Sequence, residues 1–421
     1  KLPATIGLMI LAIVMSIVII SAGYFFPAFS EGAKAIVRDV DFSKALLNVM
    51  LSFLLFAGAL HIDLGKLAEE KWSILVLAIG GVLISTFVTA TLIYYALDFI
   101  NLSIDYIYCL LFGALISPTD PIAVLALLKK TTISENLQMR INGESLFNDG
   151  VGVVVFLTIL HVAMINKTGF EMLEFGPFHY GPHTFGAGYV TLMFFQEAIG
   201  GVLMGALFGF IGFHILRWIP NEFVQMEVLV TLSLVMGGTV VAGYLDVSAP
   251  LAMVVLGIFL GNKGRSERLA EVTGEYVFKF WDLIDESLNA ILFILIGLEM
   301  LVIKFTGEYI FAGFLAIAIV LFARLVGVSI PIGIMSLGKK FEKGTIKILT
   351  WGGLRGGISV ALALALPSLG VIQLAEKEFD IKDLIVSLTF IVVVFAILVQ
   401  GLTIQKVAGG GKNKQAVGSR Q

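Results

Sequence analysis

Long hydrophobic runs recur along the whole chain and are separated by short polar segments. A helix that crosses a bilayer needs roughly 20 mostly apolar residues, and twelve runs approach or exceed this length. The runs cover residues 4–28, 43–61, 72–97, 106–128, 137–165, 189–217, 223–245, 249–263, 268–303, 308–336, 345–367 and 383–406. The pattern therefore predicts an all-α integral membrane protein with twelve transmembrane helices. We expect the short run 249–263 to be tilted and the long run 268–303 to be bent.

The composition supports a membrane location. Of 421 residues, 58% are hydrophobic and only 14% are charged, whereas soluble domains carry roughly 25% charged residues. A single cysteine, Cys109, and ten prolines exclude disulfide-stabilised and fibrous proteins. The net charge of −3 gives no basis for binding nucleic acid.

Lysine and arginine are distributed unequally between the two ends of the predicted helices. If the first run starts in the cytoplasm, eighteen of them fall on the cytoplasmic side and seven on the other. Basic residues prefer cytoplasmic connections. We therefore expect a multi-pass protein of the cell membrane with a cytoplasmic C terminus, in which residues 407–421 form a disordered tail.

Five charged residues fall well inside predicted spans: Asp120, Glu144, Asp149, Arg324 and Arg355. A charge at the centre of a bilayer costs roughly 2.5–3.5 kcal/mol. These side chains must therefore form pairs, line a hydrated cavity or take part in chemistry.

Two of the predicted spans carry residues that interrupt helices. Pro118 and Pro121 flank Asp120, and each removes a backbone donor and disturbs the preceding turn. Four glycines surround Arg355 in residues 351–358. Two broken helices that run in opposite directions, in opposite halves of the chain, are typical of inverted-repeat secondary transporters. A packed proline kink and a glycine-rich packing face are the simpler alternatives, but neither explains the charges.

The two breaks differ in the sign of the charge that they carry. Asp120 is expected to neutralise the positive ends of half-helices, and Arg355 is expected to neutralise the negative ends.

The fifth run contains two polar pairs with the spacing of one helical turn. Ser145 and Asp149 form one i, i+4 pair, and Glu144 and Asn148 form the other. Both pairs therefore lie on adjoining strips of one helix. Glu144 is compatible with an interhelical polar clamp, whereas Asp149 with Ser145 favours a functional site.

At these residues the chain resembles the sodium–proton antiporters of the first cation:proton antiporter family, the NhaP type and its animal NHE relatives. Four motifs carry the resemblance in order across nearly the full chain. They are Ser-Pro-Thr-Asp-Pro (117–121), Gly-Glu-Ser-Leu-Phe-Asn-Asp (143–149), Ala-Arg-Leu-Val-Gly-Val (323–328) and Gly-Gly-Leu-Arg-Gly-Gly (352–357).

The resemblance implies an NhaA-like fold and a homodimer in the lipid membrane. It divides the chain into a dimerisation domain, 1–70 with 166–307, and a core ion-transport domain, 71–165 with 308–406. Family members usually have thirteen spans, so an additional first helix is expected before the start of this sequence.

The resemblance also assigns roles to particular residues. It places Na⁺ on Asp149, Asp120, Ser145 and Thr119, with Asn148 beside the site and Asp63 completing it. Glu144 would form a structural salt bridge, with Arg324 as first partner and Arg355 as second. Asn289 stands where archaeal members have an arginine, which makes the animal-like branch the closer analogue.

The activity implied is exchange of Na⁺ or Li⁺ for H⁺ by competition at Asp149 with alternating access, without a cofactor and without enzymatic chemistry. Because Asn148 and not a second aspartate precedes Asp149, electroneutral one-for-one exchange is expected. A K⁺/H⁺ antiporter of the same fold stays open. An intramembrane aspartyl protease using Asp120 and Asp149, and a cation channel, are the alternatives from other classes.

Overall fold

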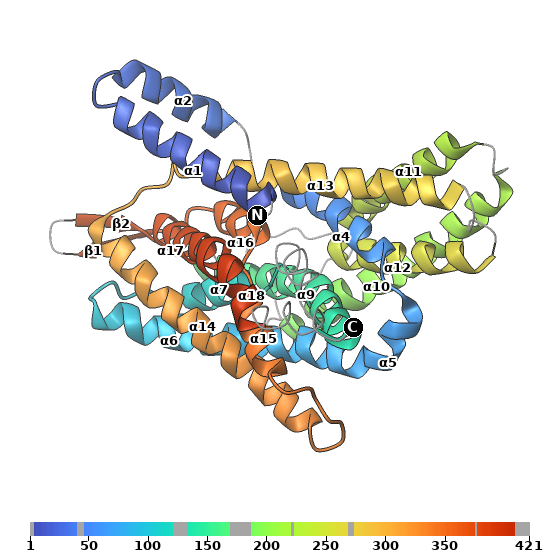
Figure 1. The fold of residues 1–421 in the computed structure, drawn as a ribbon. Coiled ribbons are helices and arrows are strands. Elements are labelled where there is room, and N and C mark those ends of the chain that lie inside the picture. The colour runs from blue at the N-terminus through green and yellow to red at the C-terminus, as the bar shows by residue number, and fades with distance from the viewer. Residues whose placement is uncertain are drawn as a thin grey trace, which may run out of the picture.

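The computed structural model describes residues 4–39, 46–120, 133–168, 187–219, 223–267, 273–374 and 377–408 (Figure 1). Within these ranges the protein consists of helices and one antiparallel hairpin. In chain order the elements are α1 (Ala4–Ala22), α2 (Pro27–Asp39), the π-helix η1 (Leu46–Met50), α4 (Leu51–Leu60), α5 (Leu64–Leu75), η2 (Val76–Gly80), α6 (Gly81–Phe99), α7 (Tyr106–Ile116), α9 (Glu135–Thr168), α10 (Ala187–Trp218), α11 (Val224–Tyr244), α12 (Ala249–Glu267), α13 (Thr273–Glu299), α14 (Gly307–Met335), α15 (Thr345–Trp351), α16 (Gly357–Leu364), β1 (Val371–Leu374), β2 (Lys377–Asp380), α17 (Ile381–Phe395), η3 (Ala396–Gln400) and α18 (Gly401–Val407).

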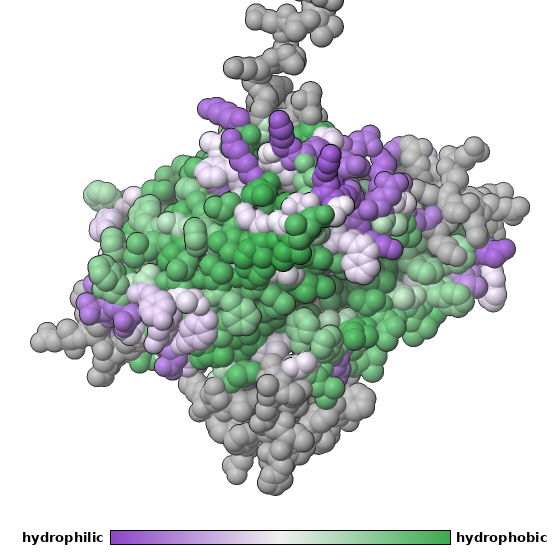
Figure 2. All heavy atoms as spheres, turned by 90° about the horizontal axis from the view of Figure 1, so that it is seen from below, coloured by the Kyte–Doolittle hydropathy of each residue, from purple (hydrophilic) through white to green (hydrophobic). Residues whose placement is uncertain are grey.

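The predicted all-helical membrane architecture is confirmed. In the described part of the chain, six helices are long and apolar enough to cross a membrane, and four shorter apolar helices accompany them. The number of twelve spans stays a prediction. Figure 2 shows a broad hydrophobic area across one face of the protein, with hydrophilic residues gathered mainly along its edges. Such a surface fits a surrounding of lipid.

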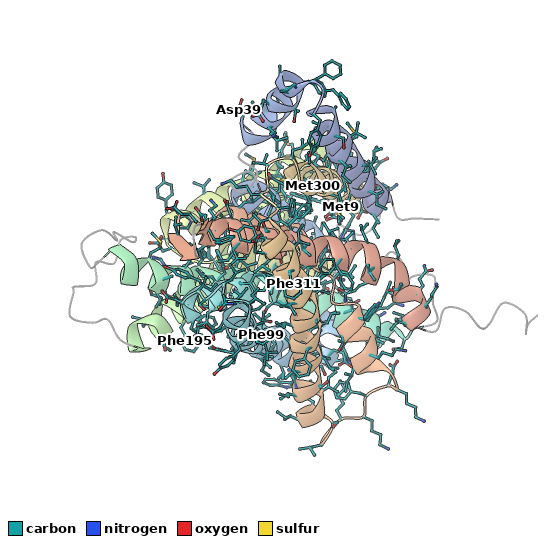
Figure 3. The ribbon with its side chains drawn as sticks, turned by 90° about the vertical axis from the view of Figure 1, so that its left-hand side faces the viewer. Met9, Asp39, Phe99, Phe195, Met300 and Phe311 are labelled. Atoms are coloured by element: carbon teal, nitrogen blue, oxygen red, sulfur yellow. The ribbon has the colours of Figure 1, made fainter. Side chains whose placement is uncertain are left out.

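The predicted first span, 4–28, is shorter in the structure. Helix α1 ends at Ala22, and Pro27 begins the separate helix α2, since proline suits the first position of a helix. The hydroxyl of Ser16 donates a hydrogen bond to the carbonyl of Gly297 at 2.9 Å, which fixes α1 on α13. In Figure 3, Met9 of α1 lies near Met300, whereas Asp39 lies at the projecting end of α2.

Two hydrophobic clusters organise the helices. The larger one runs through α6, α7, α9, α14 and α17, on the left of Figure 1 and at its centre. The smaller one joins α4 with α10, α11, α12 and α13, on the right. Its central side chain, Trp281, is fully buried and packs edge-on against Phe56. Helix α9 contacts α7 of the first group and α10 and α12 of the second, so its residues lie where the two groups meet.

Candidate functional site

Two interrupted helices cross at the centre of the larger cluster. Helix α7 ends at Ile116, two residues before Pro118, and five residues separate the end of α15 at Trp351 from the start of α16 at Gly357. The backbone N–H of Asp120 donates to the carbonyl of Leu354 at 2.9 Å, and the two residues form an isolated antiparallel bridge. The break predicted around Arg355 is therefore present. The chain is non-helical from 117 to 120, and residues 121–132 lie outside the described part.

Glycine allows the two breaks to approach this closely. A Cβ atom on Gly356 would lie 2.7 Å from an Asp120 carboxylate oxygen, and one on Gly353 would lie 2.6 Å from Nε of Arg324. Both distances are below any that real Cβ atoms adopt. A side chain at position 356 would therefore press on Asp120 of the first break, and one at position 353 would press on Arg324 of α14.

A small hydrogen-bond network connects the first break to α9. The N–H of Thr119 donates to Oδ1 of Asn148 at 3.2 Å, and Nδ2 of Asn148 donates to the Thr119 hydroxyl at 2.7 Å. The same hydroxyl lies 3.2 Å from the hydroxyl of Ser145. All three side chains are buried. The structure thus brings Thr119, Ser145 and Asn148 into one neutral polar cluster.

Two carboxylates accompany this cluster. Asp149 is only 7% exposed and follows Ser145 by one turn of α9. Asp120 is partly buried at the crossing, close enough to Asp149 for the two side chains to interact electrostatically. Carboxylate, hydroxyl and amide oxygens are the ligands that hard cations prefer. This arrangement can therefore hold a small cation or a proton.

The two arginines of the membrane region have different partners. Nη1 of Arg324 lies 2.6 Å from the carboxylate of Glu144, and both side chains are buried. Arg355, also buried, donates from Nη1 to the carbonyl of Gly353 at 2.8 Å, inside its own break. Glu144 and Arg324 are therefore the pair that the structure brings together.

Asp63 lies at a different level of the bundle. Its carboxylate caps α5 by accepting the N–H of Lys66 at 3.1 Å. Lys66 in turn pairs with Glu135, at the start of α9. Fourteen residues of α9 separate Glu135 from Asp149, which is about 21 Å of helix. The structure does not bring Asp63 to the polar cluster, because the turn between α4 and α5 holds it as a helix cap.

Helix α13 contributes Asp285 and Asn289, whose contact with each other the sequence analysis did not predict. Asn289 is buried and donates from Nδ2 to the carboxylate of Asp285 at 3.1 Å. The carboxylates of Asp285 and Asp120 repel each other, and Leu292, one turn after Asn289, packs against Gly357. One face of α13 thus lies against the crossing. The Asp-to-Asn spacing of one turn, in the polar half of the run 268–303, is the signal that could have identified them.

A buried ion pair at the end of the bundle was also missed. Arg140 binds the carboxylate of Glu70 through Nε at 2.8 Å and through Nη2 at 3.0 Å. Nζ of Lys339 lies 2.7 Å from the same carboxylate. Arg140 lies at the start of the predicted run 137–165 and Lys339 lies between two runs, and nothing in their spacing indicates a shared partner.

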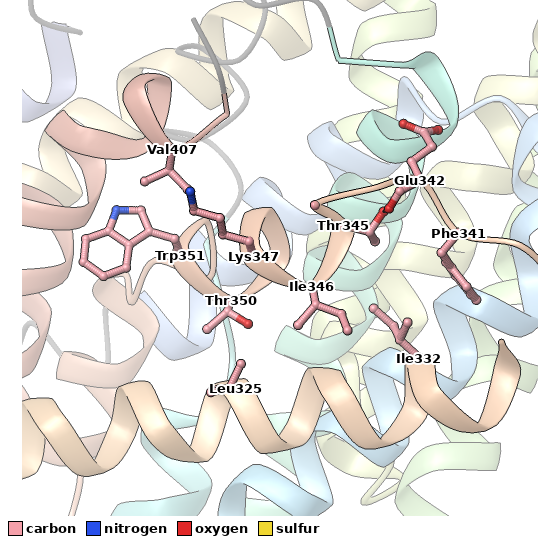
Figure 4. Close-up of a pocket in the computed structure, with 11 residues that line it drawn as sticks. Leu325, Ile332, Phe341, Glu342, Thr345, Ile346, Lys347, Thr350, Trp351 and Val407 are labelled. Atoms are coloured by element: carbon pink, nitrogen blue, oxygen red, sulfur yellow. The ribbon is translucent and has the colours of Figure 1, made fainter.

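A separate cavity of about 480 Å³ lies between α14 and α15. Figure 4 shows Leu325 and Ile332 of α14 facing Ile346 and Thr350 of α15 across it. None of the residues of the polar cluster lines this cavity, so it is not the site described above.

A helical membrane fold in which two broken helices cross beside buried carboxylates defines a secondary transporter of the inverted-repeat class. Residues 1–408 match the family described as "Sodium/hydrogen exchanger, transmembrane". The chain belongs to this family. The predicted resemblance is thereby confirmed, and the protein is a transporter and not an enzyme, which removes the protease alternative.

Named relatives and a solved structure agree with this assignment. The chain is 46% identical to the Na⁺/H⁺ antiporter NhaP of Pseudomonas aeruginosa over 96% of its length and 90% of that protein. It is 30% identical to the Na⁺/H⁺ antiporter NhaH of Halobacillus aidingensis, over 97% and 91% of the two chains. The sodium proton antiporter MjNhaP1 of Methanocaldococcus jannaschii at pH 8 shares the fold, with a TM-score of 0.68, 20% identity and coverage of 96% and 97%.

Proposed function

We propose that this protein exchanges Na⁺ or Li⁺ for H⁺ across the membrane, with cation and proton competing for Asp149. The observation that carries the proposal is the position of Asp149. Its carboxylate is buried one turn from Ser145, beside the Thr119–Asn148 hydrogen bonds and near Asp120. The names of the relatives, which are Na⁺/H⁺ antiporters, support the same substrates.

In this proposal each residue of the cluster has its own part. Asp149, Asp120, Ser145 and Thr119 would hold Na⁺ through oxygen atoms, and Asn148 would orient Thr119 through its two hydrogen bonds. Na⁺ and H⁺ are cargo, and no cofactor takes part. Asp63 is left out of the binding set because it caps α5 at the end of the bundle.

Three further charged residues would support the site without binding the ion. Glu144 and Arg324 would fix α9 against α14 by their buried ion pair. Arg355 would compensate the negative end of α15 through its contact with the carbonyl of Gly353.

Alternating access would arise from movement between two parts of the chain. We infer a core of residues 71–165 and 308–406 that moves against a dimerisation scaffold of residues 1–70 and 166–307. The two hydrophobic clusters support part of this division, because the buried residues of α6, α7, α14 and α17 belong to the larger cluster and those of α10 and α11 to the smaller. The proposal includes a homodimer in the cell membrane. The unequal distribution of Lys and Arg supports a cytoplasmic C terminus.

The exchange is proposed to be electroneutral. Asn148 precedes Asp149, and an amide carries no proton, so one cation would replace one proton. A membrane potential biases only steps that move charge, by about 2.3 kcal/mol per charge per 100 mV. In proteoliposomes the initial exchange rate should therefore be the same with and without an imposed potential.

The decisive measurement is proton flux in proteoliposomes, compared for Li⁺, Na⁺ and K⁺. We expect flux with Na⁺ and Li⁺ and only background with K⁺. Flux with K⁺ alone would replace the proposal by K⁺/H⁺ exchange. A current on solid-supported membranes that scales with Na⁺ flux would contradict electroneutrality and would indicate that Asp120 also releases a proton.

A further inference from the structure

A cavity of about 540 Å³ lies where α9 and α16 meet α10 and α12. Its walls are mainly apolar, but they include three titratable side chains: His161 of α9, Glu197 of α10 and Asp246 after α11. The proposed exchange at Asp149 uses none of them. The cavity therefore requires an explanation of its own.

The cavity continues the helix face that carries Asp149. Val153, Leu157 and His161 line it, and they follow Asp149 at successive intervals of four residues, which places all four on one face of α9. The lining thus begins one turn from Asp149 and extends for about 12 Å further along the helix. An ion in this cavity would meet the Asp149 face of α9 and no other part of that helix.

Glu197 is held firmly in the opposite wall. Its backbone carbonyl accepts the N–H of Ser248 at 3.0 Å, and Gly201 lets α10 pack closely against the same residue. The Oε2 atom of Glu197 is buried, and within the described part of the chain it has no hydrogen-bond partner. A buried carboxylate oxygen that lacks a partner is costly, so this atom is suited to receive one.

Asp246 places a second carboxylate in the same wall. Its backbone has φ of +49°, a left-handed conformation that aspartate tolerates better than most residues. The side chains of Glu197 and Asp246 both line the cavity, and no Lys or Arg occurs among the described residues that line it. A concave site with charges of one sign concentrates counter-ions. The one lining group that can carry positive charge is His161.

We propose that this cavity is the passage between Asp149 and one side of the membrane, and that Glu197, assisted by Asp246, binds the transported monovalent cation on its way through it. The inference rests on the proposed cation exchange. It adds a second binding position, formed by α10 and the segment after α11, that the motifs of the family do not include.

Accessibility of the passage can be tested by cysteine labelling. The only native cysteine, Cys109, is buried, so Cys109→Ala provides a background without thiols. Leu157→Cys then places one thiol in the cavity wall. We expect a small cationic thiol reagent to label it and Na⁺ to slow the labelling. Absence of labelling, or labelling that Na⁺ does not slow, would overturn the proposal.

The role of Glu197 has a matched control in the same group of helices. Glu227 of α11 is a buried glutamate. Like Oε2 of Glu197, its carboxylate oxygens have no hydrogen-bond partner among the described residues, but it does not line the cavity. Glu197→Gln should abolish Na⁺ protection of Leu157→Cys, and Glu227→Gln should leave it intact. If both substitutions abolish Na⁺ protection equally, the position of Glu197 in the cavity wall does not explain the loss. That result would overturn the assignment of Glu197 as a cation-binding residue.

Flux measurements separate this inference from the proposed exchange. Removing one charge near a cation should raise the Na⁺ concentration for half-maximal flux by about three- to tenfold in Glu197→Gln, with the rate at saturating Na⁺ retained. Asp149→Asn should abolish flux but keep Na⁺ protection of Leu157→Cys. Unchanged half-saturation in Glu197→Gln would contradict the second position, whereas flux in Asp149→Asn would contradict the proposed exchange alone.

Discussion

Helix α9 carries two buried polar regions that differ in how their charges are compensated. At Arg140 a bidentate contact with Glu70, reinforced by Lys339, pairs every charge. Around Ser145 and Asn148 the hydrogen bonds are neutral, and within the described part of the chain no cationic side chain pairs with Asp149. A carboxylate that already has a cationic partner holds a structure together. One that has no cationic partner can exchange a proton for a cation, and this difference distinguishes a structural ion pair from a transport site.

The largest expected effect separates these two regions directly. Asp149→Asn should reduce Na⁺-driven proton flux to the level of empty liposomes, because the amide binds neither the proton nor the cation as a carboxylate does. Glu70→Gln should retain flux, since Glu70 lies at the end of the bundle. A fluorescent pH indicator inside the vesicles measures both. Robust flux in Asp149→Asn would remove Asp149 from the centre of the mechanism.

The second prediction concerns the ion pair that lies between the two regions. Glu144→Ala leaves Arg324 buried without its partner, which should lower the free energy of unfolding by about 3–5 kcal/mol. Asp149→Asn removes no ion pair and should melt near the wild type. Thermal unfolding in detergent tests this, and Glu144→Ala with Arg324→Met should recover part of the loss. If Glu144→Ala and Asp149→Asn melt alike, Glu144 is not structural.

The third prediction concerns the closeness of the two breaks. Gly356→Ala should force Asp120 away from the crossing, with an overpacking cost of about 1–3 kcal/mol and weaker Na⁺ binding. Gly333→Ala, in α14, is the control, because nothing lies within 4 Å of the added carbon. For each variant, the Na⁺ concentration that gives half-maximal flux is divided by the wild-type value, and the two ratios are compared. A wild-type ratio for Gly356→Ala would mean that the crossing can widen without affecting the ion.

The smallest effect is expected at the surface. Lys66 and Glu135 form an exposed ion pair at 2.6 Å, and exposed pairs contribute little because water and salt screen them. Lys66→Ala should therefore change neither the melting temperature nor the flux measurably. A clear loss of stability would show that the start of α9 depends on this pair.

Much of the fold follows from local patterns in the sequence. The predicted run 137–165 corresponds to α9, Glu135–Thr168, and the run 223–245 corresponds to α11, Val224–Tyr244. The length of an apolar run and the positions of proline and glycine within it are local properties of the sequence. The helices and the break at Arg355 could therefore be predicted. The hairpin at Val371–Asp380 could not, because its pattern is that of an ordinary connection.

The candidate site was predictable only in part. The one-turn spacings of the fifth run place Ser145 and Asn148 on adjoining strips of one helix, whereas their meeting with Thr119 was implied by the resemblance to the antiporter family. The pairing of Arg140 with Glu70 depends on how α5 packs on α9, and the approach of Asp285 to Asp120 depends on where α13 crosses. Contacts of this kind between distant segments leave no local signal in one sequence.

The bridge between Asp120 and Leu354 has a consequence for experiments on this protein. Its donor and acceptor both belong to the main chain, so exchanging the side chain at either position leaves the bond available. A scan of side chains across the crossing would therefore overlook this main-chain link between the two breaks. Replacing the amide of residue 120 by an ester, through chemical or genetic-code methods, deletes that donor and makes the link accessible to measurement.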